Sequence, residues 1–169
     1  MKPPRSRRDT GQSLVEFALV IPIFLLILFG LLDMGRAVYS NNTLAQAARE
    51  ATRLAATQVA WVGSLDPACN AAAGPVCPAS VAALKTNVDA AANRMAVGLG
   101  TLASSQIYMQ CNPAASPPSG AWTGSTCNSR SAGAIVSVRV VYTFTMITPI
   151  VGQIVNNLSM SASATMLVN

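Results

Sequence analysis

Residues 11–36 read GQSLVEFALVIPIFLLILFGLLDMGR, and this stretch decides how the chain is organised. Its central part, Leu14–Leu32, is apolar apart from Glu16 and the small residues Pro22 and Gly30. At a rise of 1.5 Å per residue, a helix over this part is about 28 Å long, close to the hydrocarbon thickness of a bilayer. The sequence therefore predicts a single membrane span at about residues 14–32.

Four of the eleven basic residues precede the span: Lys2, Arg5, Arg7 and Arg8. Such a positive cluster predicts a cytoplasmic N-terminus and places the C-terminal region outside. The apolar run is longer than the core of a cleaved secretory signal, and no small-residue cleavage site follows it closely, which favours a retained anchor. Nothing after the leader repeats the basic pattern, so we expect no nucleic-acid partner.

The composition argues against an enzyme. The chain contains no histidine, and its six acidic residues are scattered: Asp9, Glu16, Asp33, Glu50, Asp66 and Asp89. No close pair of acids suggests acid–base hydrolysis, and glycine-rich phosphate loops and nucleophile motifs are missing from the sequence. We therefore expect no catalytic residues, no cofactor and no metal site.

Four cysteines, Cys69, Cys77, Cys111 and Cys127, lie after the span. Their spacing fits no zinc pattern, and three disulfide connectivities are open. The local pairing, Cys69 with Cys77 and Cys111 with Cys127, is favoured because each pair brackets a Pro/Gly-rich loop. Disulfides need an oxidising compartment, in agreement with a C-terminal region outside the cytoplasm. Four free, buried thiols are the alternative.

Helical character continues beyond the span. Small and apolar residues recur there at helical spacing, at Leu44, Ala47, Ala48, Ala51, Leu54 and Ala55. The pattern predicts either one long helix or two helices joined softly near residues 40–42. This narrow alanine-rich stripe suits close packing, and packing within one subunit is favoured over a partner surface.

The remainder predicts a small α+β domain. Apolar residues from Val81 to Leu99 indicate a second helix, with Ser80 as its N-cap and Gly98 and Gly100 at its end. Alternating segments predict about three antiparallel strands, at residues 106–111, 134–146 and 158–168. The expected organisation is a basic leader (1–11), a transmembrane helix that continues beyond the span (12–60) and an extracytoplasmic domain (61–169).

Glu16 is unusual because a carboxylate in hydrocarbon is costly. It follows Gly11 by five residues, directly behind the basic leader. This arrangement resembles the type IV prepilin signal, in which an aspartyl membrane peptidase cleaves after the glycine. The resemblance implies a mature N-terminus at Gln12, whose α-amino group could pair with Glu16 of a neighbouring subunit. The alternative is that Glu16, one turn inside the span, extends to the headgroups.

The resemblance reaches further, from Gly11 to about Ala55. Its elements are Gly11-Gln12-Ser13, Glu16-Phe17, Pro22, Gly30, Asp33, Gly35-Arg36, and Ala47-Ala48-Arg49-Glu50-Ala51 with Arg53. Together they resemble the TadE-like family of pseudopilins, from the tight-adherence (Flp pilus) system. Membership implies a membrane-anchored minor pilin-like subunit in a bacterial inner membrane. The implied partners are a prepilin peptidase, other pilin-like subunits, the pilus assembly machinery and membrane lipid.

A second function is open on the sequence alone. A signal-anchored protein whose extracytoplasmic domain binds a ligand or adheres, without cleavage at Gly11, would carry the same span and cysteines. For a pilin-like subunit, the sequence leaves three roles open: entering the filament, capping it or priming it.

Overall fold

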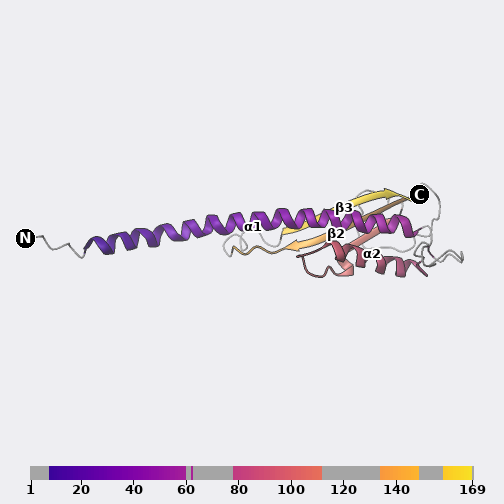
Figure 1. Ribbon diagram of the computed structural model, residues 1–169, viewed down its shortest axis with the longest axis horizontal. Coiled ribbons are helices and arrows are strands. Elements are labelled where there is room, and N and C mark those ends of the chain that lie inside the picture. Colours follow the sequence, from indigo (N-terminus) through magenta and orange to yellow (C-terminus); the bar gives the residue numbers. More distant parts are fainter. Residues whose placement is uncertain (1–7, 60–61, 63–77, 112–133, 149–157, 169) are drawn as a thin grey trace, which may run out of the picture. The chain divides into compact units, whose positions relative to one another are not determined.

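The computed structural model describes residues 8–59, 62, 78–111, 134–148 and 158–168. Along the chain the elements are α1 (Arg8–Gln58), α2 (Val81–Met95), the short 3-10 helix η2 (Ser104–Gln106), β1 (Ile107–Cys111), β2 (Ile135–Phe144) and β3 (Leu158–Leu167) (Figure 1). This is the predicted α+β fold, with a long N-terminal apolar helix, one further helix and three antiparallel strands.

Helix α1 is continuous. It passes through Pro22 and through residues 40–42 without a break, so the single-helix alternative is confirmed. Proline lacks a backbone N–H and removes one hydrogen bond from a helix interior, which is tolerated in a membrane-spanning segment.

Helix α2 begins as predicted and ends earlier than predicted. The Ser80 hydroxyl oxygen accepts a hydrogen bond from the backbone N–H of Ala83 (3.2 Å), so Ser80 is the N-cap. The prediction that the helix continues to Leu99 is wrong, because α2 stops at Met95. Gly98 has a φ of 82°, a left-handed conformation that a right-handed helix cannot contain and that glycine adopts readily.

The chain divides into two compact units. One comprises Met1–Ala37 and Thr145–Asn157, and the other comprises Val38–Phe144 and Leu158–Asn169. The second unit holds the strands, α2 and the C-terminal part of α1.

In the second unit, the strands form an antiparallel sheet in the order β1-β2-β3. Val138, at the centre of β2, lies opposite Met109 of β1 and Ala164 of β3. Alternate residues of β2 (Val136, Val138 and Val140) are fully buried, which confirms the predicted inner face. Strand β3 alternates between half-buried residues and exposed Ser and Thr, as expected for a sheet with one covered face.

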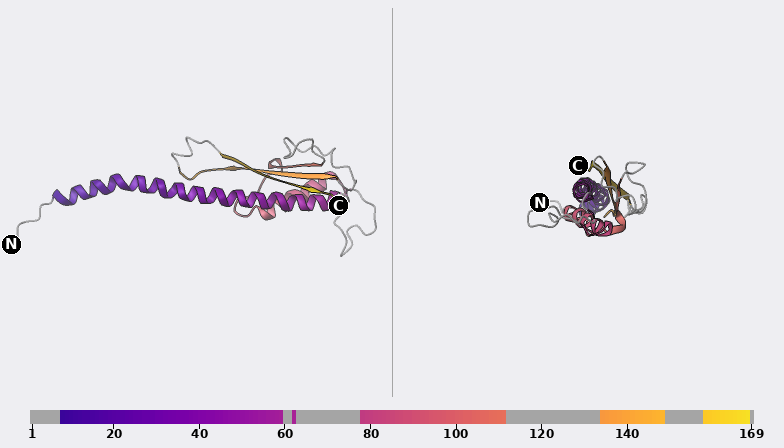
Figure 2. Two further views of the ribbon diagram at one scale, coloured as in Figure 1. Left: turned by 90° about the horizontal axis from the view of Figure 1, so that it is seen from above. Right: turned by 90° about the vertical axis from the view of Figure 1, so that its right-hand side faces the viewer.

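Within this unit, the C-terminal part of α1 and α2 cover the same face of the sheet (Figure 2). The core joins residues of both helices and all strands, including Leu44, Ala48, Ala51, Ala55, Leu84, Val88, Met109, Val138 and Val140. The alanine stripe of α1 is therefore a packing surface within one subunit, as predicted. Small side chains allow the helix to approach closely, and close contact preserves dispersion interactions.

Side-chain hydrogen bonds fix the two helices of this unit in an antiparallel arrangement. Asn87 of α2 donates to the side-chain oxygen of Gln58 (3.1 Å), near the end of α1. At the opposite end, the Tyr39 hydroxyl donates to the carbonyl of Val97 (3.1 Å), just beyond α2. Since the chain of α1 runs from Tyr39 to Gln58 while α2 runs from Asn87 towards Val97, the two helices point in opposite directions.

Candidate functional site

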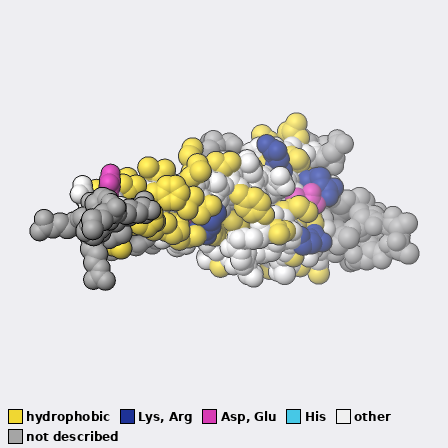
Figure 3. Space-filling view, turned by 60° about the vertical axis from the view of Figure 1, so that its left-hand side comes forward, with side chains coloured by type: hydrophobic (Ala, Val, Ile, Leu, Met, Phe, Trp, Pro, Cys, Tyr) yellow, Lys and Arg dark blue, Asp and Glu magenta, His cyan; other side chains and the backbone are white. Residues whose placement is uncertain are grey.

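The N-terminal part of α1 carries an exposed apolar surface. Among the described residues, one helix is long and apolar enough to cross a membrane, Gly11–Gln58. The large exposed side chains in its N-terminal part are Leu14, Val15, Phe17, Leu19, Val20, Ile23, Phe24, Leu25, Leu26, Ile27, Leu28, Phe29, Leu31 and Leu32. Figure 3 shows hydrophobic side chains covering this part of the chain. Exposed apolar surface of this extent marks a membrane or protein contact.

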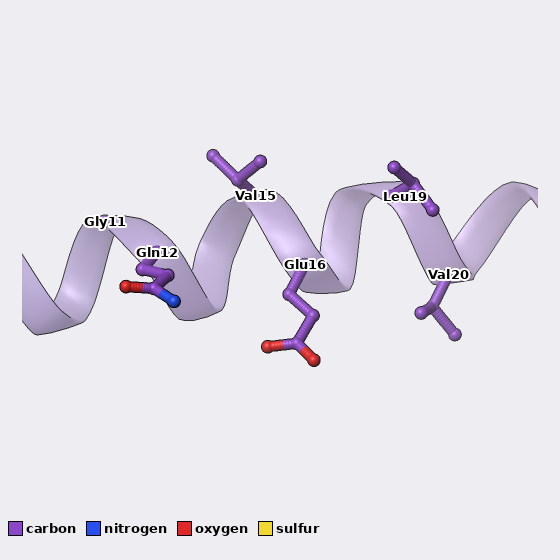
Figure 4. A pocket seen from close by; sticks show the side chains of 6 residues that line it. All are labelled: Gly11, Gln12, Val15, Glu16, Leu19 and Val20. Atoms are coloured by element: carbon purple, nitrogen blue, oxygen red, sulfur yellow. The ribbon is translucent and has the colours of Figure 1, made fainter.

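At the start of this surface, six residues line a shallow site: Gly11, Gln12, Val15, Glu16, Leu19 and Val20. Because residues four apart lie on one side of a helix, Gln12, Glu16 and Val20 form one row, and Gly11, Val15 and Leu19 form the next. Figure 4 shows Val15 and Leu19 pointing to one side and the Glu16 carboxylate to the other, on the side of Gln12. The helix thus presents the predicted new N-terminal residue and the carboxylate on one face.

Glu16 differs from the other acidic side chains that the structure describes. Asp33 is paired with Arg36, Glu50 with Arg53 and Asp89 with Lys85. In the described part of the chain, no hydrogen bond or ion pair joins Glu16 to another residue. An unpaired carboxylate among exposed apolar side chains is poorly placed in an isolated subunit in lipid, and a cation from another molecule would relieve it.

Gly11 lies inside α1, in the first turns after Arg8. A side chain added at Gly11 would meet nothing within 4 Å, so the fold itself does not require glycine there. Proteases bind their substrates in extended form, and glycine weakens a helix by about 1 kcal/mol relative to alanine. The glycine therefore makes the helix easier to unwind at the bond after Gly11.

A second polar cluster lies in the first compact unit, around Asp33. One oxygen of its carboxylate accepts the backbone N–H of Ile147 (3.0 Å). The other accepts the backbone N–H and the hydroxyl of Thr148 (2.9 and 2.6 Å). Arg36, one helical turn away, lies 3.6 Å from the same carboxylate. The carboxylate therefore joins α1 to the segment that follows β2.

The surroundings of Asp33 favour its charged form. The hydrogen bond from the Thr148 side chain, followed by that from the Ile147 backbone, holds the pKa of Asp33 below the ordinary value of 3.8. Asp33 is 7% exposed and Thr148 3% exposed, so water contributes little to either group. Hydrogen bonds to a charged acceptor are about twice as strong as those between neutral groups.

The sequence predicted only part of this cluster. The pair of Asp33 with Arg36 is present, but the principal partners of Asp33 are Ile147 and Thr148, more than a hundred residues away. The one available signal was an acid placed directly after an apolar run, and it does not identify the partner.

The predicted cysteine pairs fall mostly outside the described residues. Cys111, at the end of β1, is buried and takes part in a disulfide. Cys69, Cys77 and Cys127 lie outside the described ranges. The local pairing of Cys69 with Cys77 and of Cys111 with Cys127 therefore stays a prediction.

A third cluster is structural. The buried ammonium group of Lys85 on α2 is paired with Asp89, and it donates to the hydroxyl of Ser104 (2.9 Å). The same hydroxyl donates to the second oxygen of Asp89 (2.6 Å). These bonds attach η2 to α2 and account for the burial of Lys85, since a buried charge needs a hydrogen-bonded partner.

Comparison with known proteins gives one match. A family model described as TadE-like protein matches residues 11–53. No curated protein and no solved structure matches the chain. The match covers the exposed apolar part of α1, both Gly11 and Glu16, and the start of the alanine stripe, and it confirms the resemblance predicted from those residues.

Proposed function

We propose, from the TadE-like match over residues 11–53, that this chain is a membrane-anchored, pilin-like minor pseudopilin that serves the assembly of Flp (tight-adherence) pili. The match indicates a pilin-like protein associated with these pili, from a pilus-associated family rather than an enzyme family. The finer role, including processing by a prepilin peptidase after Gly11, is our proposal.

One observation carries the proposal most directly: the exposed, unpaired Glu16, five residues after Gly11 on a family-matched helix. Cleavage after Gly11 would remove the basic leader and leave an α-amino group on Gln12, with a pKa near 8 and hence a positive charge at neutral pH. In an assembling bundle, Glu16 of one subunit accepts hydrogen bonds from this group on its neighbour. Charge-assisted hydrogen bonds of this kind are strong where water is excluded.

The exposed apolar surface of α1 supports an anchor that can also assemble. In a membrane, lipid covers the side chains of residues 14–32, and in a bundle other pilin-like helices cover them. We assign the basic leader (1–11) to the cytoplasmic side of a bacterial inner membrane, by the positive-inside rule. The pilin-like helix (12–60) crosses the membrane, and the α+β domain (61–169) lies outside, where its cysteines can be oxidised.

The proposal is tested by replacing Glu16 with glutamine, which removes the charge and keeps the shape of the side chain. We expect Glu16→Gln to insert and to be cleaved like the wild type, and to enter cross-linked pilin assemblies about thirtyfold less well or worse. The reason is that removing the charge of one partner in a buried charge pair leaves the other charge unpaired. This loss costs about 2–5 kcal/mol in the free energy of assembly. The measurement is the yield of cross-linked assemblies from membranes containing equal amounts of each chain.

Val15→Ala is the matched control, since Val15 is exposed on the neighbouring row and carries no charge. It should assemble like the wild type. Equal assembly of Glu16→Gln and the wild type would show that Glu16 does not pair between subunits.

A further inference from the structure

The segment that follows β2 is held beside the outer end of the membrane span. Strand β2 ends at Phe144, and three residues later the chain donates two backbone N–H groups to Asp33. Asp33 directly follows Leu32, the last residue of the predicted span. Hydrogen-bond distances of 2.9–3.0 Å therefore place the backbone of Ile147 and Thr148 at the level where the span leaves the hydrocarbon.

The N–H groups of Ile147 and Thr148 and the hydroxyl of Thr148 already have an acceptor. Both N–H groups and the hydroxyl of Thr148 are donated to Asp33, and the carboxylate in turn has three donors and Arg36 nearby. A backbone outside regular structure can lie near hydrocarbon only when its polar groups have partners within the protein. The Asp33 cluster meets this requirement for the backbone N–H groups of Ile147 and Thr148.

The segment exposes one large apolar side chain, that of Ile147, together with the side chain of Thr145. Ile147 is 57% exposed, whereas the neighbouring Thr148 faces inward. Met34, next to Asp33 on α1, is 67% exposed and continues the apolar surface of the span. The sequence contains no charged residue after Arg139, so the segment itself carries no charge; the charges beside it are those of Asp33, which accepts its hydrogen bonds, and of Arg36.

We propose that the segment Thr145–Thr148 is a second membrane contact, in which Ile147 inserts among the headgroups of the outer leaflet beside the emerging α1. The headgroup region is about 5–7 Å thick on each side of the hydrocarbon, enough to cover a side chain at the level of Asp33. The occupant of this surface is lipid. The contact holds Thr145–Thr148 at the membrane surface. The proposal rests on membrane anchoring by α1 but not on processing at Gly11.

The test is tryptophan fluorescence of the full chain, in vesicles of phosphatidylethanolamine and phosphatidylglycerol that carry brominated acyl chains. The two native tryptophans are replaced (Trp61→Phe and Trp122→Phe), and one reporter is introduced by Ile147→Trp. We expect lipid brominated near the headgroup to remove most of the reporter's fluorescence, and lipid brominated near the acyl end to remove much less.

Two further reporters serve as controls. Ile23→Trp, at an exposed position in the middle of the span, should show the reverse depth preference. Leu167→Trp, exposed at the far end of β3, should be quenched by neither lipid. Quenching at position 23 with none at position 147 overturns the second contact and leaves the anchor standing. No quenching at position 23 overturns both.

A second copy of the chain is the other possible cover for Ile147. It would protect the position 147 reporter from brominated lipid while allowing cross-links between copies at that position. This result also overturns the lipid contact.

Discussion

Replacing Gly11 with leucine is expected to abolish removal of the first eleven residues and to leave the rest of the protein unchanged. Two effects act in the same direction. The larger side chain hinders entry of the bond after residue 11 into a protease cleft, where glycine presents no side chain. Leucine also strengthens the helix by nearly 1 kcal/mol relative to glycine, which opposes the unwinding that cleavage of a helical segment needs.

The structure makes this substitution informative, because nothing lies within 4 Å of a side chain added at Gly11. A loss of cleavage therefore cannot be attributed to a clash within the described fold. Gly30→Leu is the matched control, since Gly30 lies on the same helix and has equally open surroundings. The Gly30 variant should be cleaved like the wild type. The measurement is the intact mass of each chain from cells with an active prepilin peptidase, and full cleavage of Gly11→Leu would contradict the assignment of the site.

Replacing Asp33 with alanine is expected to release the segment after β2 from α1. The variant loses three hydrogen bonds to a charged acceptor and leaves the backbone N–H of the buried Thr148 without its partner. These losses lower the free energy of local opening by about 2–3 kcal/mol. The amides of Ile147 and Thr148 should therefore exchange with solvent roughly 30- to 150-fold faster than in the wild type. Hydrogen exchange of these two amides measures the effect.

Arg36→Ala is the control for this prediction. Its guanidinium is 3.6 Å from Asp33 and about half exposed, so the pair contributes at most about 1 kcal/mol. Exchange at Ile147 and Thr148 should change less than tenfold. If Arg36→Ala and Asp33→Ala accelerated exchange equally, the ion pair rather than the hydrogen bonds would hold the segment.

The same cluster predicts a pH dependence. Because the pKa of Asp33 is lowered in the folded chain, its stabilising contribution is complete above the ordinary aspartate value of 3.8. The contribution is lost as the pH falls from that value through the lowered pKa, since the protonated side chain accepts these hydrogen bonds more weakly. Protection of the two amides, corrected for the intrinsic exchange rate, should therefore fall in this acidic range in the wild type and not in Asp33→Ala.

Local patterns predicted the elements of this fold because each pattern has a direct physical cause. The valines at every second position of β2 can bury one face only in a strand, and the apolar run at residues 14–32 is too long for a core helix of a small domain. The spacing of alanines after the span likewise predicted the buried stripe. In each case, neighbouring residues along the chain carry the whole signal.

The sequence could not predict contacts that depend on the three-dimensional fold. Asp33 and Thr148 are 115 residues apart, and neither has a neighbour that identifies the other. The burial of Lys85 was also missed, because it depends on Ser104 after α2 as well as on Asp89. The end of α2 was placed too late because apolar spacing continued to Leu99, whereas the left-handed turn at Gly98 requires the helix to stop earlier.

The central claim is that the chain is a processed pilin-like subunit, and one measurement tests it most directly. The intact mass of the protein is determined after extraction from membranes of cells with and without a prepilin peptidase. We predict a chain that begins at Gln12 when the peptidase is present and at Met1 when it is absent. A chain that retains Met1 in cells with active peptidase would contradict the account, and would favour a signal-anchored binding or adhesion protein that is not cleaved at Gly11.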